Sequence, residues 1–207
     1  TGVQLTSIAK SALFDSANSE RLTRTPDSAG NQRTWTFSTW FYKTKHGANT
    51  TILTSNLSGS NFAEIRIQSD DKFRCYVHNG GSNGDVKTAR VLRDIGWYHL
   101  VVSVDTTSNT IEKRIRLFIN GQYVSNLTTK NYPSQNLDQA ICSANAHDIG
   151  GNSDTAFLDG FLAETVLIDG TALEPTSFAQ YDSTGTFWTP KSSIDIKALT
   201  FGTTGFY

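Results

Sequence analysis

The stretch from Trp97 to Asp105 reads WYHLVVSVD, and its apolar residues recur with a period of two. Successive side chains of a β-strand point to opposite sides of the sheet, so Tyr98, Leu100, Val102 and Val104 share one face. The opposite face includes a histidine and a serine beside its apolar residues. This stretch therefore predicts a β-strand whose first face lies in a hydrophobic core.

The same period of two recurs along most of the chain, in runs that Gly, Asn, Asp and Ser separate. The clearest runs predict strands at Arg33 to Lys43, Thr51 to Thr54, Phe62 to Ser69, Phe73 to His78, Trp97 to Asp105, Arg114 to Asn120 and Phe161 to Asp169. Turn-forming pairs such as Asn120-Gly121 favour hairpins of antiparallel strands. One short helical turn is predicted near 175–181, because Pro175 suits the first turn of a helix. We expect an all-β fold, a two-sheet antiparallel β-sandwich that forms a single domain over residues 1–207.

Composition excludes several classes of protein. The 19 acidic and 18 basic residues nearly cancel and no basic run occurs, so we expect no nucleic-acid partner. No apolar run approaches the length of about 18 residues that crosses a bilayer, so no membrane insertion is expected. Ser, Thr and Asn supply 62 of the 207 residues, so hydroxyl and amide groups carry most of the polarity. Cys75 and Cys142 are too few for a disulfide framework and are expected to be reduced and structural.

Five segments in chain order carry a resemblance to a known family. They are Arg33–Trp40, Trp97–Val102, Phe118–Gly121, Ile149–Gly151 and Leu158–Glu164. Together they resemble the concanavalin A-like, laminin-G-like jelly-roll family, in the form found in phage and virus tail or virion-surface proteins. The resemblance covers nearly all of the chain. It is specific for a fold and not for a ligand.

The resemblance implies a sandwich of the concanavalin A-like lectin and glucanase type, often carbohydrate-binding and often with a structural calcium ion. It also implies a module of a longer adhesin, placed outside the cell or on a virion surface. The expected partners are a surface glycan or polysaccharide and other virion subunits.

Aromatic side chains suggest where a glycan would bind. The strand from Trp35 to Tyr42 has bulky side chains on both faces, with Trp40 and Tyr42 on one of them. One face must meet the core, which leaves the other exposed or covered by long loops. Exposed rings on a sheet stack on the apolar faces of sugars, and Phe73 to His78 offers a similar second face. The predicted ligand-binding residues are Trp40, Tyr42, His46, Tyr76 and His78.

Oxygen ligands gather on the Gly-rich stretch from Asp148 to Gly160, which is flexible enough to surround Ca²⁺. Asp154 and Asp159 in this stretch are predicted metal ligands, with ordinary Asx turns as the alternative. Asp15 joins them because the terminal strands of such sandwiches lie side by side. Glu164 places a carboxylate on an apolar strand face, where it needs either a hydrogen-bonding or arginine partner or a metal.

The sequence supports three classes of function. A non-enzymatic carbohydrate-binding adhesion module, part of a viral tail fibre or virion-surface protein, is the prediction. An architectural module without a ligand is the alternative. A polysaccharide-active enzyme is the third. None of the five glutamates lies in the Glu-x-Asp-x-x-Glu pattern of glucanases. The only residues that suit a polysaccharide lyase are Tyr42, Tyr76, His78 and Arg66.

Overall fold

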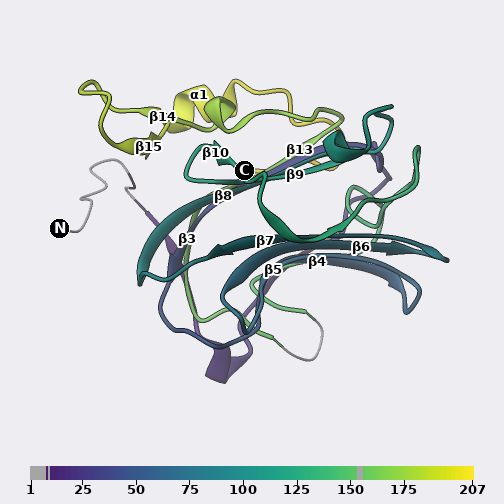
Figure 1. Ribbon diagram of the computed structural model, residues 1–207, viewed down its shortest axis with the longest axis horizontal. Helices are drawn as coiled ribbons and strands as arrows, with labels where there is room; N and C mark the ends of the chain where they lie inside the picture. Colours follow the sequence, from purple (N-terminus) through teal and green to yellow (C-terminus); the bar gives the residue numbers. More distant parts are fainter. Residues whose placement is uncertain (1–7, 9, 153–155) are drawn as a thin grey trace.

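The computed structural model of the protein describes residue 8, residues 10–152 and residues 156–207. Two large sheets pack face to face, and every strand pairs with its neighbours in antiparallel fashion (Figure 1). We name the six-stranded sheet sheet A and the seven-stranded sheet sheet B. The predicted all-β sandwich is confirmed.

Sheet A has the strand order β1-β13-β3-β8-β9-β10. Its strands are β1 Ala12–Phe14, β13 Gly160–Asp169, β3 Thr34–Lys43, β8 Gly96–Asp105, β9 Ile115–Ile119 and β10 Gln122–Tyr123. The long strands β13, β3 and β8 lie beside one another at its centre. Their alternating apolar residues explain why they were the clearest strands in the sequence.

Sheet B has the strand order β11-β7-β6-β5-β4-β12-β2. Its strands are β11 Leu127–Asn131, β7 Ser82–Val91, β6 Lys72–Asn79, β5 Asn61–Ile67, β4 Thr50–Ser58, β12 His147–Ile149 and β2 Leu22–Arg24. Tight turns join β4 to β5, β5 to β6 and β6 to β7, so four consecutive strands form a meander.

The C-terminal part contains the helical turn predicted near 175–181, but the turn is shorter than expected. A 3-10 helix, η3, covers only Pro175–Ser177, and β14 (Ala179–Tyr181) follows it and pairs with β15 (Trp188–Pro190). A short α-helix, α1, spans Ser193–Lys197. The other 3-10 helices are η1 (Ser16–Asn18) and η2 (Ile111–Lys113). Within the described ranges, no helix is long and apolar enough to span a membrane.

The core lies between the two sheets. The inward face of β8 is the predicted one, with Leu100, Val102 and Val104 almost fully buried. Residues Ile115, Leu117 and Ile119 of β9 also point inward, as their alternation indicates. Cys75 and Cys142 are free thiols buried in this core, as predicted.

A further layer covers the outer face of sheet A. We name residues 171–201 the C-terminal layer; Figure 1 shows it in yellow-green and yellow above sheet A. Its Phe178 and Ile196 pack on Val101, Phe118 and other outward residues of the sheet. The sandwich therefore has two apolar interfaces, one between the sheets and one between sheet A and the C-terminal layer.

Candidate functional site

The outer face of sheet B presents side chains in three parallel rows that the strand register defines. The middle row crosses the sheet through Thr54, Glu64, Tyr76, Asp85 and Asn131. One flanking row contains Asn56, Phe62, His78 and Asn83, and the other contains Thr51, Arg66, Arg74, Lys87 and Thr129. The described residues form no hydrophobic cluster above this face comparable to the one on sheet A.

Three rings meet where the first two rows adjoin. Phe62 lies 5.3 Å from Tyr76 and 5.6 Å from His78 between ring centroids, and Tyr76 and His78 are 6.5 Å apart. All three are partly exposed. The Nδ1–H of His78 donates to the carbonyl oxygen of Ser60 at 2.8 Å, which fixes the orientation of its ring. We name Phe62, Tyr76 and His78 the aromatic cluster.

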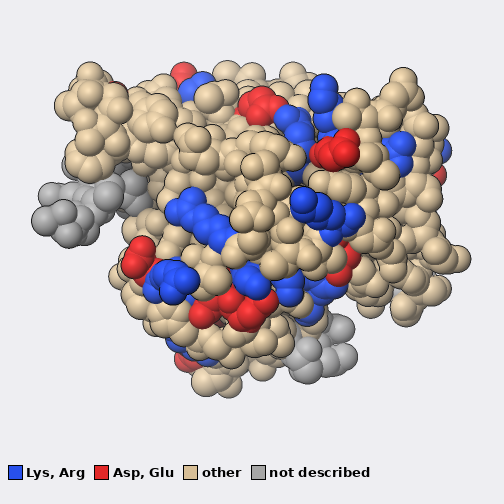
Figure 2. Space-filling view, viewed as in Figure 1, with Lys and Arg blue, Asp and Glu red and all other residues tan. Residues whose placement is uncertain are grey.

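Ion pairs link the middle row to the basic row. Arg74 donates to both carboxylate oxygens of Asp85 at 2.6 Å and lies 4.5 Å above the ring of Tyr76. The hydrogen bonds to Asp85 raise the pKa of Arg74 against the opposing effect of burial. Arg66 lies 3.1 Å from Glu64, whose other oxygen accepts from Thr51 at 2.9 Å. On the side of the molecule in Figure 2, acidic and basic side chains are also interspersed, and neither forms a separate patch.

The five predicted ligand-binding residues do not form one site. Tyr76 and His78 lie together on sheet B, whereas Trp40 and Tyr42 lie on the outer face of sheet A. Trp40 is only 3% exposed, because Ala179 and Trp188 of the C-terminal layer pack on it. The expectation of an exposed Trp40 ring is therefore wrong, and covering by a distant segment is the correct alternative.

Tyr42 and His46 have other surroundings. Tyr42 is partly exposed and makes edge-to-face contacts with Trp97 and Phe161, at 5.3 and 5.8 Å between centroids. His46 lies beyond the end of β3, with Nδ1 2.8 Å from Nζ of Lys43 and 3.1 Å from Oδ2 of Asp71. Burial would raise the pKa of Asp71, but its hydrogen bonds to Lys43 and His46 outweigh that effect and lower it. Neither residue contacts the aromatic cluster.

His99 fastens the C-terminal layer to sheet A. The indole N–H of Trp188 donates to Nδ1 of His99 at 3.0 Å, so the ring proton is on Nε2, which donates to Oγ of Ser38 at 2.9 Å. The ring of Trp40 stacks on the imidazole at 5.0 Å. Burial lowers the pKa of His99 to about 3, because the interior disfavours the charged form. His99 is thus a neutral structural histidine.

The predicted metal ligands are only partly brought together. Phe14 of β1 pairs with Gly160 of β13, and the two strands are antiparallel. Asp15, which follows Phe14, and Asp159, which precedes Gly160, therefore lie at the same end of the strand pair, as expected for terminal strands. The Asp15 carboxylate accepts from the backbone of Ala17 at 2.8 Å, and Asp159 lies 3.0 Å from Nζ of Lys45.

The third predicted ligand, Asp154, lies outside the described residues. Among the residues that are described, no three His, Cys, Asp or Glu side chains are placed to hold one ion. The described residues therefore place two of the three predicted ligands at one end of the sandwich and add no third carboxylate or imidazole there.

Glu164 has a hydrogen-bonding partner and not an arginine. The hydroxyl of Tyr207 donates to Oε2 of Glu164, and burial together with this carboxylate raises the pKa of Tyr207. Glu164 has φ of 49° at a register shift between Ala163 and Val166, so its backbone is in the left-handed region. Both residues line a cavity of about 380 Å³ at the edge of the sandwich, whose walls are mostly apolar.

Two features of the candidate face were missed in the sequence. Phe62 was placed in a strand but not among the ligand-binding residues, because only the register reveals that it faces His78. The strand β7, which supplies Asp85, was not predicted. Its buried positions include Gly84 and Thr88, which give only a weak apolar signal, although the alternation with Asp85 is present.

The comparisons with known proteins agree with this architecture. A family model described as the concanavalin A-like lectin/glucanases superfamily, of the laminin G type, matches residues 16–177. The chain belongs to this superfamily. No curated protein matches the sequence.

Solved structures with the same fold have low sequence identity to the chain. Domain 4 of an extracellular arabinanase from Geobacillus stearothermophilus, in complex with arabinotriose, is 18% identical with a TM-score of 0.56, over 75% of this chain and 68% of that one. A putative carbohydrate-binding protein from Bacteroides ovatus is 15% identical with a TM-score of 0.52, over 88% and 59%. Domains LG4-5 of the mouse laminin alpha1 chain are 17% identical with a TM-score of 0.51, over 71% and 38%. These similarities concern the fold.

Proposed function

We propose that the protein is a non-enzymatic carbohydrate-binding module and that the outer face of sheet B binds the glycan. The observation that carries this proposal is the aromatic cluster, three partly exposed rings within 6.5 Å of one another on the outer face of sheet B. Such rings stack on the C–H faces of sugars, and adjacent amides such as Asn56 and Asn83 satisfy hydroxyl groups. The fold similarity to an arabinanase domain in complex with arabinotriose and to a putative carbohydrate-binding protein supports the same function.

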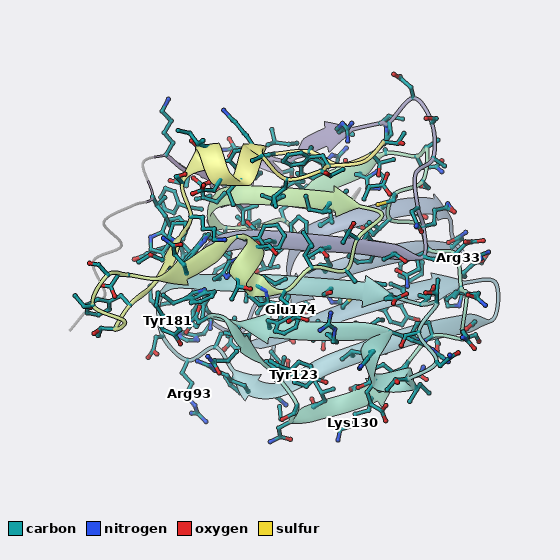
Figure 3. All side chains as sticks on the ribbon, turned by 90° about the horizontal axis from the view of Figure 1, so that it is seen from above. Arg33, Arg93, Tyr123, Lys130, Glu174 and Tyr181 are labelled. Atoms are coloured by element: carbon teal, nitrogen blue, oxygen red, sulfur yellow. The ribbon has the colours of Figure 1, made fainter. Side chains whose placement is uncertain are left out.

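The experiment is a glycan array followed by titration of the best ligand into two variants. Tyr76→Ala removes a ring of the cluster and should weaken binding by about tenfold or more while the protein stays folded. Tyr123→Ala is the matched control, because Tyr123 is 47% exposed on the opposite side of the sandwich (Figure 3). If both variants bound the glycan with the same affinity as the parent protein, the outer face of sheet B would not be the binding site.

We propose further that the module acts outside the cell as part of an adhesin on a phage tail or virion surface. Five sequence segments that resemble such proteins support this context. Detection of the chain in purified virions by mass spectrometry tests it.

The second candidate function is an architectural module that contacts other subunits. The observation in its favour is the exposure of Tyr123, Tyr181 and Phe187, at 47, 49 and 44%, on the outer side of sheet A. Figure 3 shows Tyr123 and Tyr181 on this face. An array without any bound glycan, together with self-association in sedimentation that Tyr181→Ala abolishes, would support this function instead.

We also retain calcium as a proposal, supported by the common end at which Asp15 and Asp159 lie. Calcium would stabilise the edge formed by β1 and β13 and would take no part in sugar stacking. Its test is thermal unfolding, described below.

A further inference from the structure

We infer that the glycan bound by this face is uncharged, an inference that rests on the proposed carbohydrate-binding function and names its ligand class. It follows from the way the charges on the outer face of sheet B are arranged.

The basic row would attract anions if it stood alone. Arg66, Arg74 and Lys87 are direct neighbours across three strands of sheet B. Three adjacent positive charges are the usual means of binding sulfate or carboxylate groups, since arginine forks match both anions. A glycan-binding face with this row exposed would therefore favour sulfated, sialylated or uronic-acid sugars.

Each cation of the row already has a carboxylate partner. Arg66 pairs with Glu64 at 3.1 Å, Arg74 with Asp85 at 2.6 Å, and Lys87 with Asp70 at 3.1 Å. Lys72, at the edge of the same face, shares Asp70 at 3.4 Å. Burial alone would raise the pKa of Asp70, but Lys87 and Lys72 outweigh it and lower the pKa, so the carboxylate stays charged near neutral pH. The three positive charges of the row are thus matched by three carboxylates, and Lys72, which shares Asp70, leaves one positive charge at the edge of the face.

The compensating carboxylates also stand in the way of an anion. Glu64 and Asp85 belong to the middle row, between the basic row and the row of Phe62 and His78. Arg74 lies 4.5 Å from the ring of Tyr76, so an anionic group on a sugar stacked there would meet this guanidinium together with the Asp85 carboxylate that already neutralises it. Like charges in proximity repel, so an anionic sugar gains no attraction and loses its own hydration.

The groups at the two ends of the aromatic row suit hydroxyls. Asn56 and Asn83 occupy the same row as Phe62 and His78, and both are exposed. An amide donates and accepts hydrogen bonds, as a sugar hydroxyl does, and carries no charge. Aromatic rings with neutral amides at both ends of their row and ion pairs beside them form a face complementary to a neutral polysaccharide.

The first experiment uses an array that carries neutral oligosaccharides beside their charged counterparts, such as N-acetyllactosamine with its sulfated form and dextran with dextran sulfate. We expect binding to neutral members, weaker binding by about tenfold or more to charged ones, and little change between low and high salt. Stronger, salt-sensitive binding of the charged members would overturn the inference and leave the carbohydrate-binding function standing. Absence of binding to every glycan would overturn both.

The second experiment tests whether removing one carboxylate shifts binding from neutral toward anionic glycans. Asp85→Asn removes one compensating charge and should raise affinity for dextran sulfate by about tenfold, because the Arg74 guanidinium is then uncompensated. Glu174→Gln is the matched control, since it uncovers Arg116 on the opposite side of the sandwich, where Figure 3 shows Glu174. No gain for Asp85→Asn in a protein that melts like the parent, or an equal gain for Glu174→Gln, would count against the inference.

Discussion

Acidification should destabilise the protein through His99, the imidazole buried between sheet A and the C-terminal layer. Its pKa in the folded protein is about 3, against an ordinary value of 6.5. As the pH falls below 6.5, the unfolded chain takes up a proton that the folded protein excludes. The stability that the neutral ring provides is therefore complete above pH 6.5, and it decreases until the pH reaches about 3.

The magnitude follows from the separation of the two pKa values. One pKa unit corresponds to about 1.4 kcal/mol, so at about pH 4.5 the loss is on the order of 3 kcal/mol. That is a large share of the 5–15 kcal/mol roughly typical of a folded domain. A proton on Nδ1 would also face the indole N–H of Trp188, which now donates to that atom at 3.0 Å. The C-terminal layer should therefore be the first region to loosen.

The assay is urea unfolding of the parent protein and of His99→Gln, each at about pH 7 and about pH 4.5. Both proteins also lose stability on acidification because other groups take up protons. One of these groups is His147, because burial lowers its pKa too. The difference between them isolates His99, and the parent should lose about 3 kcal/mol more than the variant over this interval.

Two results would refute the reasoning. Equal losses in the parent and in His99→Gln would show that the imidazole is not excluded from protonation by folding. Titration of the His99 ring signals near pH 6.5 in the folded protein, measured by NMR, would lead to the same conclusion.

Further predictions concern the core, the metal and the thiols. Leu100→Ala should lower the free energy of unfolding by about 2–5 kcal/mol and the exposed Lys130→Ala by less than about 0.5, as measured by urea unfolding; equal effects would contradict the burial of Leu100 in the core. If the proposed calcium site exists, millimolar calcium should raise the melting temperature of the parent and not of Asp159→Ala, and identical shifts in the two proteins would argue against it. Burial raises the pKa of Cys75 and Cys142 to about 12, so neither should react with iodoacetamide near pH 8 until the protein is unfolded; rapid labelling of the native protein would show that the thiols are accessible.

The strands of the centre of each sheet were predictable because their signal is local. In β8 the alternation of Tyr98, Leu100, Val102 and Val104 identifies both the strand and its inward face, and packing follows that pattern. The alternation of Arg116 with Leu117 in β9 did the same. Short strands such as β2, and β7 with its small buried residues, carry too few large apolar side chains for such a signal.

The candidate site was predictable only in part. Tyr76 and His78 share a face by the period of two, so their proximity was expected from β6 alone. Phe62 completes the cluster because β5 pairs with β6 in one particular register, and Asp85 neutralises Arg74 because β7 pairs on the other side. Register describes how two strands align with each other, so it cannot be deduced from the sequence of either strand alone.

The sequence alone determined the sandwich. Apolar and polar residues alternate within each strand, and burying the apolar face of a sheet requires a second sheet packed against it. What it left open is the function of the faces that remain. Both sides of β3 are bulky, and nothing within Trp35 to Tyr42 distinguishes an exposed Trp40 from a covered one. The tertiary structure decides this, because Ala179 and Trp188, far along the chain, fold back over Trp40 and close the outer face of sheet A. With that face closed, the partly exposed aromatic cluster is on sheet B, since apolar burial depends on which distant segments meet and not on local pattern.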